Sequence, residues 1–340
     1  MTFTIGRNFH IIHMTGDLRE LDMWYYDVFS VRRFMPEGYM AAEKRDASLV
    51  LLGELCVEPL APAFRVQRWD GMPLGRFYRQ HGERFHSLAW YVDEGMGELY
   101  ERLREAGIEC RGTAGARLTG PYVDGPVFTH PRDTSTQLEF IPAPNAPGGP
   151  AMLRDPRYEA GWRPSWWADY HPLQIQKVSH VTVSTFGLAK ALEVYVEVLQ
   201  GRLLYETDNP ALNSRSAFVL VGEDLVVELA EPVGDGPLQD DMARFHDGIY
   251  AVTFKVRDLD DARRYLKRKG VKVTWSSPTA FVTDPETTHS VVMGFTTWEV
   301  PDDPRPDWTE WSEGFLPARL FVAFDAPSAG RDGMPPEDRA

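Results

Sequence analysis

Two histidines and two glutamates occupy matching places in the first half of this 340-residue chain. His10 and His86 each stand near the start of an apolar strand, seven residues before an aspartate, and the first of these aspartates, Asp17, can cap a helix. Glu58 and Glu139 each end the last strand of the segment that follows. Two imidazoles and two carboxylates suit a borderline divalent ion such as Zn²⁺, Ni²⁺, Co²⁺ or Fe²⁺. The sequence therefore predicts a metal site made of His10, Glu58, His86 and Glu139, provided that the strands bring them together.

An internal repeat supplies the elements that position these side chains. A strand followed by an amphipathic helix recurs four times, at residues 8–31, 85–111, 178–206 and 249–273, and each copy is followed by further strand-like segments. Each module is therefore β-α-β-β-β. One module leaves a face of its small sheet uncovered, so modules must pair to close a core. We predict an α+β protein in which four modules pair into two domains.

The predicted boundaries follow composition. Residues 1–145 form the metal-binding domain, 146–176 a linker rich in Pro, Gly and Trp, 177–324 a second domain and 325–340 a disordered tail. Trp162, Trp166 and Trp167 indicate that the linker packs against a domain surface. Side chains alternate along a strand, so Trp90 is expected on the face of His86, as a wall of the substrate pocket, while His13 faces away from His10.

The composition limits which binding partners and which cellular compartment we expect for this protein. The net charge of −14 and the absence of a basic run exclude nucleic acid and anionic membrane surfaces as expected partners. No apolar stretch approaches the roughly 20 residues that cross a bilayer. The two cysteines and the opening residues show no disulfide or export pattern, so we expect a cytoplasmic protein. The oligomeric state stays open, with a homodimer as one option.

The pattern resembles the vicinal oxygen chelate superfamily, which includes glyoxalase I, methylmalonyl-CoA epimerase and the type I extradiol dioxygenases. The resemblance covers residues 8–142 and 178–297. The stretches "PLGRFYRQHGERFHSLAWYVD" and "FTHPRDTSTQLEF" are similar to those that carry the last two ligands in the epimerase. The family places ligands at the heads of the first and fifth strands and at the ends of the fourth and eighth. The resemblance thus implies the paired-module fold and metal ligands at His10, Glu58, His86 and Glu139.

The second half keeps only part of this ligand set. His180 and Glu228 correspond to His10 and Glu58, whereas Ala251 replaces the second histidine and Met293 the last glutamate. We read His246 and His289 as structural or surface residues. Modules of this family can also swap, in which case His180 and Glu228 would join His86 and Glu139. We expect the unswapped pairing, because adjacent units with a short connection usually pack together.

Three functions are compatible with this pattern. The first is a metal-dependent lyase, isomerase or epimerase that acts on a small molecule with neighbouring oxygens, moving a proton through a metal-bound enediolate. Glu139 or Glu58 would be the base, with Glu43 as a further candidate. The second is an Fe²⁺ extradiol-type dioxygenase that uses His10, His86 and Glu139. The third is a non-catalytic small-molecule binding protein with an aromatic-lined cleft.

Overall fold

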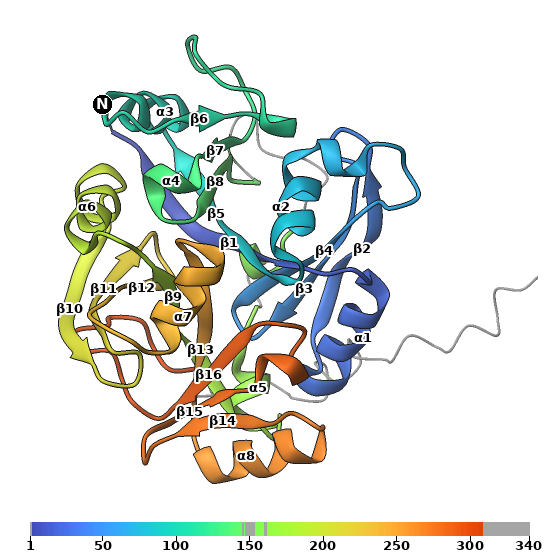
Figure 1. Cartoon of the computed structure of the whole chain (residues 1–340), viewed down its shortest axis with the longest axis vertical. Helices are drawn as coiled ribbons and strands as arrows, with labels where there is room; N and C mark the ends of the chain where they lie inside the picture. Colours follow the sequence, from blue (N-terminus) through green and yellow to red (C-terminus); the bar gives the residue numbers. More distant parts are fainter. Residues whose placement is uncertain (1, 145, 147–153, 160–161, 309–340) are drawn as a thin grey trace, which may run out of the picture.

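Two eight-stranded sheets form the frame of the molecule (Figure 1). The computed structural model describes residues 2–144, 146, 154–159 and 162–308. The first sheet has the order β2-β3-β4-β1-β5-β8-β7-β6, and the second repeats it as β10-β11-β12-β9-β13-β16-β15-β14. The prediction of an α+β fold with four β-α-β-β-β modules in two domains is confirmed. The predicted tail, 325–340, lies outside the described residues.

The first half contains two modules. Asp17 begins the first helix, because its side chain accepts a hydrogen bond from the backbone N–H of Glu20 at 3.0 Å. The elements are β1 Thr4–Met14, α1 Leu18–Phe29, β2 Arg32–Met40, β3 Arg45–Leu52, β4 Leu55–Pro62, α2 Pro73–His81, β5 Arg84–Glu94, α3 Met96–Glu105, β6 Cys110–Arg111, β7 Val127–Thr129, α4 Pro131–Thr134 and β8 Gln137–Pro142, with short 3₁₀ turns η1 Trp69–Gly71 and η2 Thr113–Gly115.

The second half repeats this order. Asp258 caps its last helix as Asp17 caps the first, accepting from the N–H of Asp261 at 2.8 Å. After η3 Pro156–Tyr158 and α5 Ser165–Asp169, the elements are β9 Ile175–Ser184, α6 Leu188–Leu192 continued by the π-helix η4 Glu193–Val198, β10 Arg202–Asn209, β11 Ser214–Val221, β12 Leu225–Pro232, α7 Pro237–Phe245, β13 Gly248–Val256, α8 Leu259–Arg268, β14 Val273–Ser276, β15 Ala280–Thr283, η5 Pro285–Thr287 and β16 Val292–Thr296.

Modules pair within each half. β1 runs antiparallel to β5 in the first sheet, and β9 runs antiparallel to β13 in the second. The swapped alternative, in which His180 and Glu228 would join His86 and Glu139, is therefore wrong for this chain. A 3₁₀ turn and one short helix connect the two modules of the first half, which leaves them close enough to share a sheet.

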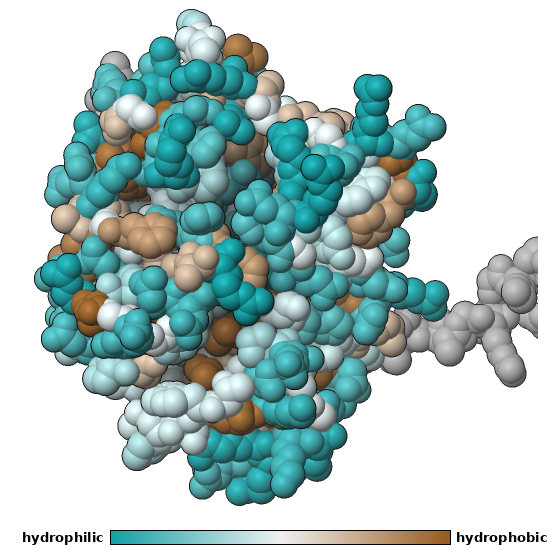
Figure 2. All heavy atoms as spheres, in the orientation of Figure 1, coloured by the Kyte–Doolittle hydropathy of each residue, from teal (hydrophilic) through white to brown (hydrophobic). Residues whose placement is uncertain are grey.

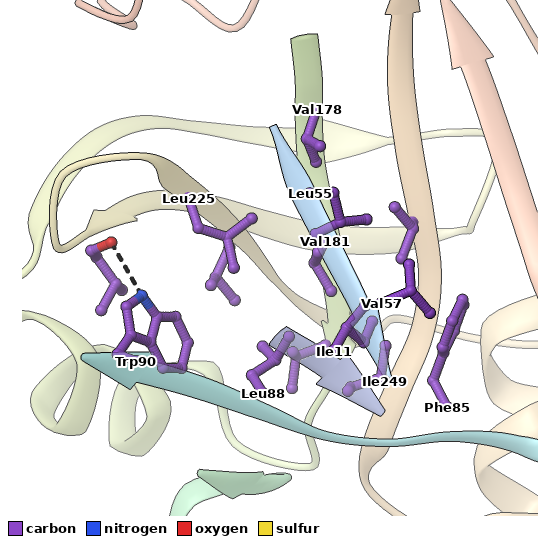
Figure 3. Packing of buried hydrophobic residues seen from close by; sticks show 14 of the residues in the cluster. Ile11, Leu55, Val57, Phe85, Leu88, Trp90, Val178, Val181, Leu225 and Ile249 are labelled. Atoms are coloured by element: carbon purple, nitrogen blue, oxygen red, sulfur yellow. Dashed lines mark hydrogen bonds between the residues drawn. The ribbon is translucent and has the colours of Figure 1, made fainter. Parts of the chain in front are cut away.

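A continuous apolar core joins the two halves (Figure 3). Ile11 and Leu88 of the first sheet face Val181 and Ile249 of the second, and all four are almost completely buried. Because this face of each sheet is used for packing, only the opposite face remains for a ligand. No helix among the described residues is long and apolar enough to cross a membrane.

Each half is followed by a similar short segment, which we call the strap: residues 155–157 after the first half and 303–305 after the second. Arg157 is completely buried, pairs with Asp155, and donates to the carbonyl oxygens of Glu54 and Phe9. Arg305 pairs with Asp303 in the same way and donates to the carbonyls of Asp224 and Ser179, the equivalent positions of the second half. The duplication thus extends into the linker, through a repeated Asp-Pro-Arg sequence. Trp167 is buried and its indole N–H donates to the Phe29 carbonyl, so the linker packs against the core as predicted.

Candidate metal centre in the first half

The register of the first sheet places three of the four predicted ligands on one face. His10 lies opposite Ala89, and Ala89 lies opposite Glu139 on the next strand. Ile12 lies opposite Glu58 and, two residues along β1, shares the face of His10. Since directly opposite residues point to the same side of a sheet, His10, Glu58 and Glu139 converge. This is the face that the apolar core does not use.

These three side chains meet without hydrogen bonds among themselves. The Nε2 of His10 lies 3.2 Å from Glu58 Oε2 and 3.4 Å from Glu139 Oε2. Both ring nitrogens of His10 and the Oε2 of Glu58 are buried and have no hydrogen-bond partner among the described residues. Unpaired buried polar atoms are expensive, because they have lost water and gained nothing. A positive species between the imidazole and the two carboxylates would satisfy His10 Nε2 and Glu58 Oε2.

A buried arginine completes the cluster. Arg45 on β3 donates from Nη1 to Glu58 Oε1 at 2.6 Å and from Nε to Glu43 Oε2 at 2.6 Å. Burial alone would lower the pKa of Arg45, but Glu58 and Glu43 outweigh it and raise the pKa above its ordinary value. The guanidinium therefore stays charged and offsets one of the three carboxylates of Glu43, Glu58 and Glu139. Two negative charges remain uncompensated, which favours binding of a cation.

A cavity of about 160 Å³ opens onto these carboxylates. Leu74 of α2 and the loop at 112–115 close it, while Glu43, Glu58 and Glu139 line it. Arg111 also lines the cavity, but it is paired with Glu109. We call this cavity the cup. Its volume suits a small molecule, and its lining combines five charged side chains with apolar ones, of which Phe128 is aromatic.

His86 is displaced from the other three by a β-bulge. The pairing of β1 with β5 shifts by one residue between Ile11–Leu88 and His13–Phe85, so His86 and Ser87 both lie opposite Ile12. The Nδ1 of His86 is 2.9 Å from Ser87 Oγ, and its ring packs against Phe77 at 4.4 Å between centroids. Burial lowers its pKa to about 3. The neighbouring His10 also lowers this pKa, so the two imidazoles lie within electrostatic reach of each other. Among the described residues no hydrogen bond or ion pair joins His86 to His10, Glu58 or Glu139, and His86 lines a different cavity.

Trp90 is a core residue and not a wall of the cup, so this expectation was wrong. It is completely buried on the face of Ile11 and Leu88, and its indole N–H donates to the carbonyl of Val221 at 3.3 Å (Figure 3). The bulge breaks the alternation that linked Trp90 with His86. His13 also lies on this core side, as predicted, where its ring bridges the Tyr25 hydroxyl and the His289 carbonyl.

The second half has lost the equivalent site in a different way from that expected. Its bulge is at the same place, so the strand register makes Tyr250 the counterpart of His86, and Gly294 the counterpart of Glu139. The assignment of Ala251 and Met293 to these positions was one residue out in each case. A side chain at Gly294 would meet the Thr253 hydroxyl, 2.5 Å from an ideal Cβ, so no ligand fits there without a change of neighbour.

Glu228 shows what a structural carboxylate looks like in this fold. It accepts hydrogen bonds from Thr182 at 2.6 Å and from Asn209 at 3.0 Å, so both of its oxygens are satisfied by neutral donors. Its neighbour His180 is 3.5 Å away. Glu58, by contrast, faces a guanidinium on one oxygen and an unpaired imidazole on the other. The two halves thus contain a satisfied carboxylate and an unsatisfied one at the same place in the fold.

The donor set of the first half fits a divalent ion in type, although the side chains are not gathered tightly. In the part of the chain that the structure describes, no group of three or more His, Cys, Asp or Glu side chains stands as a complete metal-binding cluster. The orphaned His10 nitrogens and Glu58 Oε2 nevertheless offer one imidazole and one carboxylate, with Glu139 as a second carboxylate. Such a set suits Zn²⁺, Ni²⁺, Co²⁺ or Fe²⁺.

Sequence comparison identifies the second half. Residues 177–288 match the model of the Glyoxalase/Bleomycin resistance protein/Dioxygenase superfamily. The second half therefore carries a domain of this superfamily. The resemblance read from the sequence is therefore confirmed, and the first half shares the fold of the matched superfamily domain strand for strand. Comparison with curated proteins gave no significant match.

Comparison with solved structures shows the same tandem fold in one protein and a shorter partial match in another. A variant of 4-hydroxymandelate synthase from Streptomyces coelicolor superposes with a TM-score of 0.63 at 14% identity, covering 90% of this chain and 95% of that one. Methylmalonyl-CoA epimerase from Mycobacterium tuberculosis is 21% identical over 36% of this chain and 87% of that one, with a TM-score of 0.34. At these identities the synthase shows the tandem fold alone, and the reaction must be argued from the site.

Proposed function

We propose that the first half is a divalent-metal-dependent active site that moves a proton on a small substrate with two neighbouring oxygens, giving isomerase, epimerase or lyase chemistry. One observation carries this proposal. His10 Nε2 and Glu58 Oε2 are buried, unpaired and 3.2 Å apart, with Glu139 3.4 Å from the same nitrogen. At the matching place in the second half the carboxylate is fully hydrogen-bonded.

The residues take different roles. His10 and Glu58 would hold the ion, with Arg45 fixing Glu58 from its other oxygen. When bound, the ion supplies positive charge that stabilises negative charge developing on the substrate. Glu139 lines the cup, its side chain is 13% exposed, and it makes no hydrogen bond in the described structure. We assign it the proton transfer, because it lines the cup and, unlike Glu43 and Glu58, accepts no hydrogen bond from Arg45.

The composition of the cluster favours non-redox chemistry over ring cleavage. An extradiol site needs two histidines and one carboxylate around Fe²⁺ with open positions. Here one histidine and two carboxylates converge, whereas the Nδ1 of His86 is bonded to Ser87 and His86 forms no ion pair with these carboxylates in the described structure. The five charged side chains in the lining of the cup, against a single aromatic one, likewise favour an enzyme over the aromatic binding cleft of a sequestering protein. The second half would serve as a scaffold.

Solvent exchange tests this function. Protein loaded with Co²⁺, Ni²⁺ or Zn²⁺ is incubated in D₂O with a panel of 2-hydroxyketones, 1,2-dicarbonyl adducts and acyl thioesters carrying a second carbonyl, and deuterium uptake is followed by NMR. Uptake should occur with at least one class, and Glu139→Gln should abolish it while Glu228→Gln preserves it. Equal loss in both variants would contradict the assignment. Oxygen consumption with catechols and Fe²⁺ instead of exchange would support the dioxygenase.

A further inference from the structure

A second cavity, much larger than the cup, lies between the two halves of the molecule. Its volume is about 790 Å³, and its lining comes from α2, the start of β5, the segment around α4, the segment entering α6 and the end of α7. These elements surround one region of the face shown in Figure 1. We call this cavity the interdomain cleft. It shares only Gln137 with the lining of the cup, so the two cavities are neighbours with different surroundings.

The lining of the interdomain cleft includes Arg84, whose buried guanidinium has a donor without an acceptor among the described residues. Arg84 is 8% exposed, and its Nη2 donates to Asp241 at 3.2 Å and to the Ile249 carbonyl at 3.4 Å. Its Nη1 is buried and has no hydrogen-bond acceptor among the described residues. Leaving a charged donor without an acceptor is costly. An anion in the cleft would supply the missing acceptor.

The rest of the lining gives the cleft a positive character that is unusual for this acidic chain. Arg132 and Lys190 stand exposed at its edge, and Arg84 lies in its lining. Four histidines line it as well, but burial lowers the pKa of His81, His86 and His130, so these three offer hydrogen bonds and no positive charge. The acids in the lining are already engaged. Asp133 accepts from the Glu109 backbone N–H at 3.0 Å and lies 3.4 Å from Arg132, while burial raises the pKa of Asp247. The histidines are His81, His86, His130 and His246.

Aromatic rings form the apolar part of the same cavity. The Arg84 guanidinium lies over the Phe245 ring at 4.0 Å, and Phe77 and Phe186 also line the cleft. Phe186 is 59% exposed, which is high for a phenylalanine and leaves its ring available to a ligand. Hydrophilic residues otherwise dominate the visible surface (Figure 2). A cavity with a few convergent polar groups and aromatic walls is the usual form of a small-molecule site.

We propose that the interdomain cleft is a second ligand site, which binds a small organic anion: a carboxylate or phosphate group held by Arg84, attached to an aromatic body that packs against Phe77, Phe186 and Phe245. The anion takes the free Nη1 donor, with Arg132 and Lys190 drawing it in. This site requires neither the metal nor the reaction assigned to the cup.

Calorimetric titration with phenyl phosphate, benzoate and inorganic phosphate tests the proposal on the full chain. One equivalent of phenyl phosphate or benzoate should bind at least tenfold more tightly than inorganic phosphate, and the better of the two identifies the anion. EDTA should leave this binding unchanged, which separates it from the cup. Arg84→Gln should weaken it at least tenfold, and Arg132→Glu with Lys190→Glu at least threefold.

The matched control is Arg79→Glu, on the exposed part of α2 outside the cleft, which changes charge in the same direction and should leave binding unchanged. The double variant at Arg132 and Lys190 decides the matter if Arg84→Gln does not fold, because both side chains are exposed. Absence of binding to wild-type protein, or equal binding by the double variant and wild type, would overturn the proposal.

Discussion

Arg45→Met isolates the charge balance of the cup. The substitution keeps most of the apolar stem but removes the cation that holds Glu58 and Glu43, both at 2.6 Å. Arg45 is 13% exposed and Glu58 3%, so the pair is buried. At an effective dielectric constant of about 20, two unit charges about 4 Å apart attract by about 4 kcal/mol. Breaking one side of a buried pair typically costs about 3–5 kcal/mol.

That loss should be measurable by calorimetry and urea unfolding of EDTA-treated protein. For a domain of this size, about 3–5 kcal/mol corresponds to a melting temperature lower by roughly 6–20 °C. Arg215→Met is the control, since Arg215 lies on β11, the strand equivalent to β3, and its pair with Glu231 is 61% exposed on the arginine side. An exposed pair contributes about 0–1 kcal/mol.

Added Co²⁺ should stabilise Arg45→Met more than wild type, because a dication then balances the carboxylates that Arg45 no longer neutralises. Saturation at 100 times the Kd adds about 2.7 kcal/mol. If the melting temperature of Arg45→Met lies within about 2 °C of that of Arg215→Met, then Glu58 and Glu43 do not form the charged, buried cluster from which the site was inferred.

Three further predictions concern the scaffold. Burial raises the pKa of Asp224 to about 6, above its ordinary 3.8, so ionisation of this carboxyl opposes folding as the pH rises from about 4 to about 6. Asp224→Asn should therefore stabilise the protein by about 3 kcal/mol above pH 6, and this gain should disappear below about pH 4. Urea unfolding at a series of pH values measures the difference. An unchanged difference across pH would refute this sign. Arg157→Met should cost about 3–5 kcal/mol in the same assay, because it leaves Asp155 buried and unpaired; a cost below 1 kcal/mol would mean that the strap is not structural. Trp90→Leu should lower the free energy of unfolding by about 2–4 kcal/mol, while the folded variant keeps the metal affinity of the wild type. A loss of metal affinity would show that Trp90 contributes to the cup.

The repeat made most of the fold predictable. Each module combines a period-2 strand with a period-3.6 helix, and Asp17 and Asp258 mark helix starts, so the order of elements followed from local pattern. It was harder to predict from the sequence which side chains share one face of the sheet. Strand alternation linked His10 with Glu58 and Glu139 correctly, but the bulge at His86 inserts one residue into the count and reverses the faces beyond it.

Arg45 was missed for a related reason. It lies in the charged stretch "AAEKRDAS", which has the composition of a solvated loop, yet Arg45 begins β3 and lines the cup together with Glu43, which lies in the turn before the strand. The signal available was an arginine near the start of a strand whose partner strand carries Glu58. The interdomain cleft could not be read from the sequence, since its lining comes from five separate segments whose positions depend on how the halves pack.

The most direct test of the central claim is a metal titration of matched variants. EDTA-stripped wild type, His10→Gln and His180→Gln are titrated with Co²⁺ by calorimetry, and purified protein is analysed for metal content. One equivalent should bind to wild type and to His180→Gln with equal affinity, whereas His10→Gln should bind at least about 100-fold more weakly, more than the 10–100-fold typical of losing a supporting residue. Equal affinity in all three proteins, or loss in His180→Gln alone, would contradict a metal site in the first half.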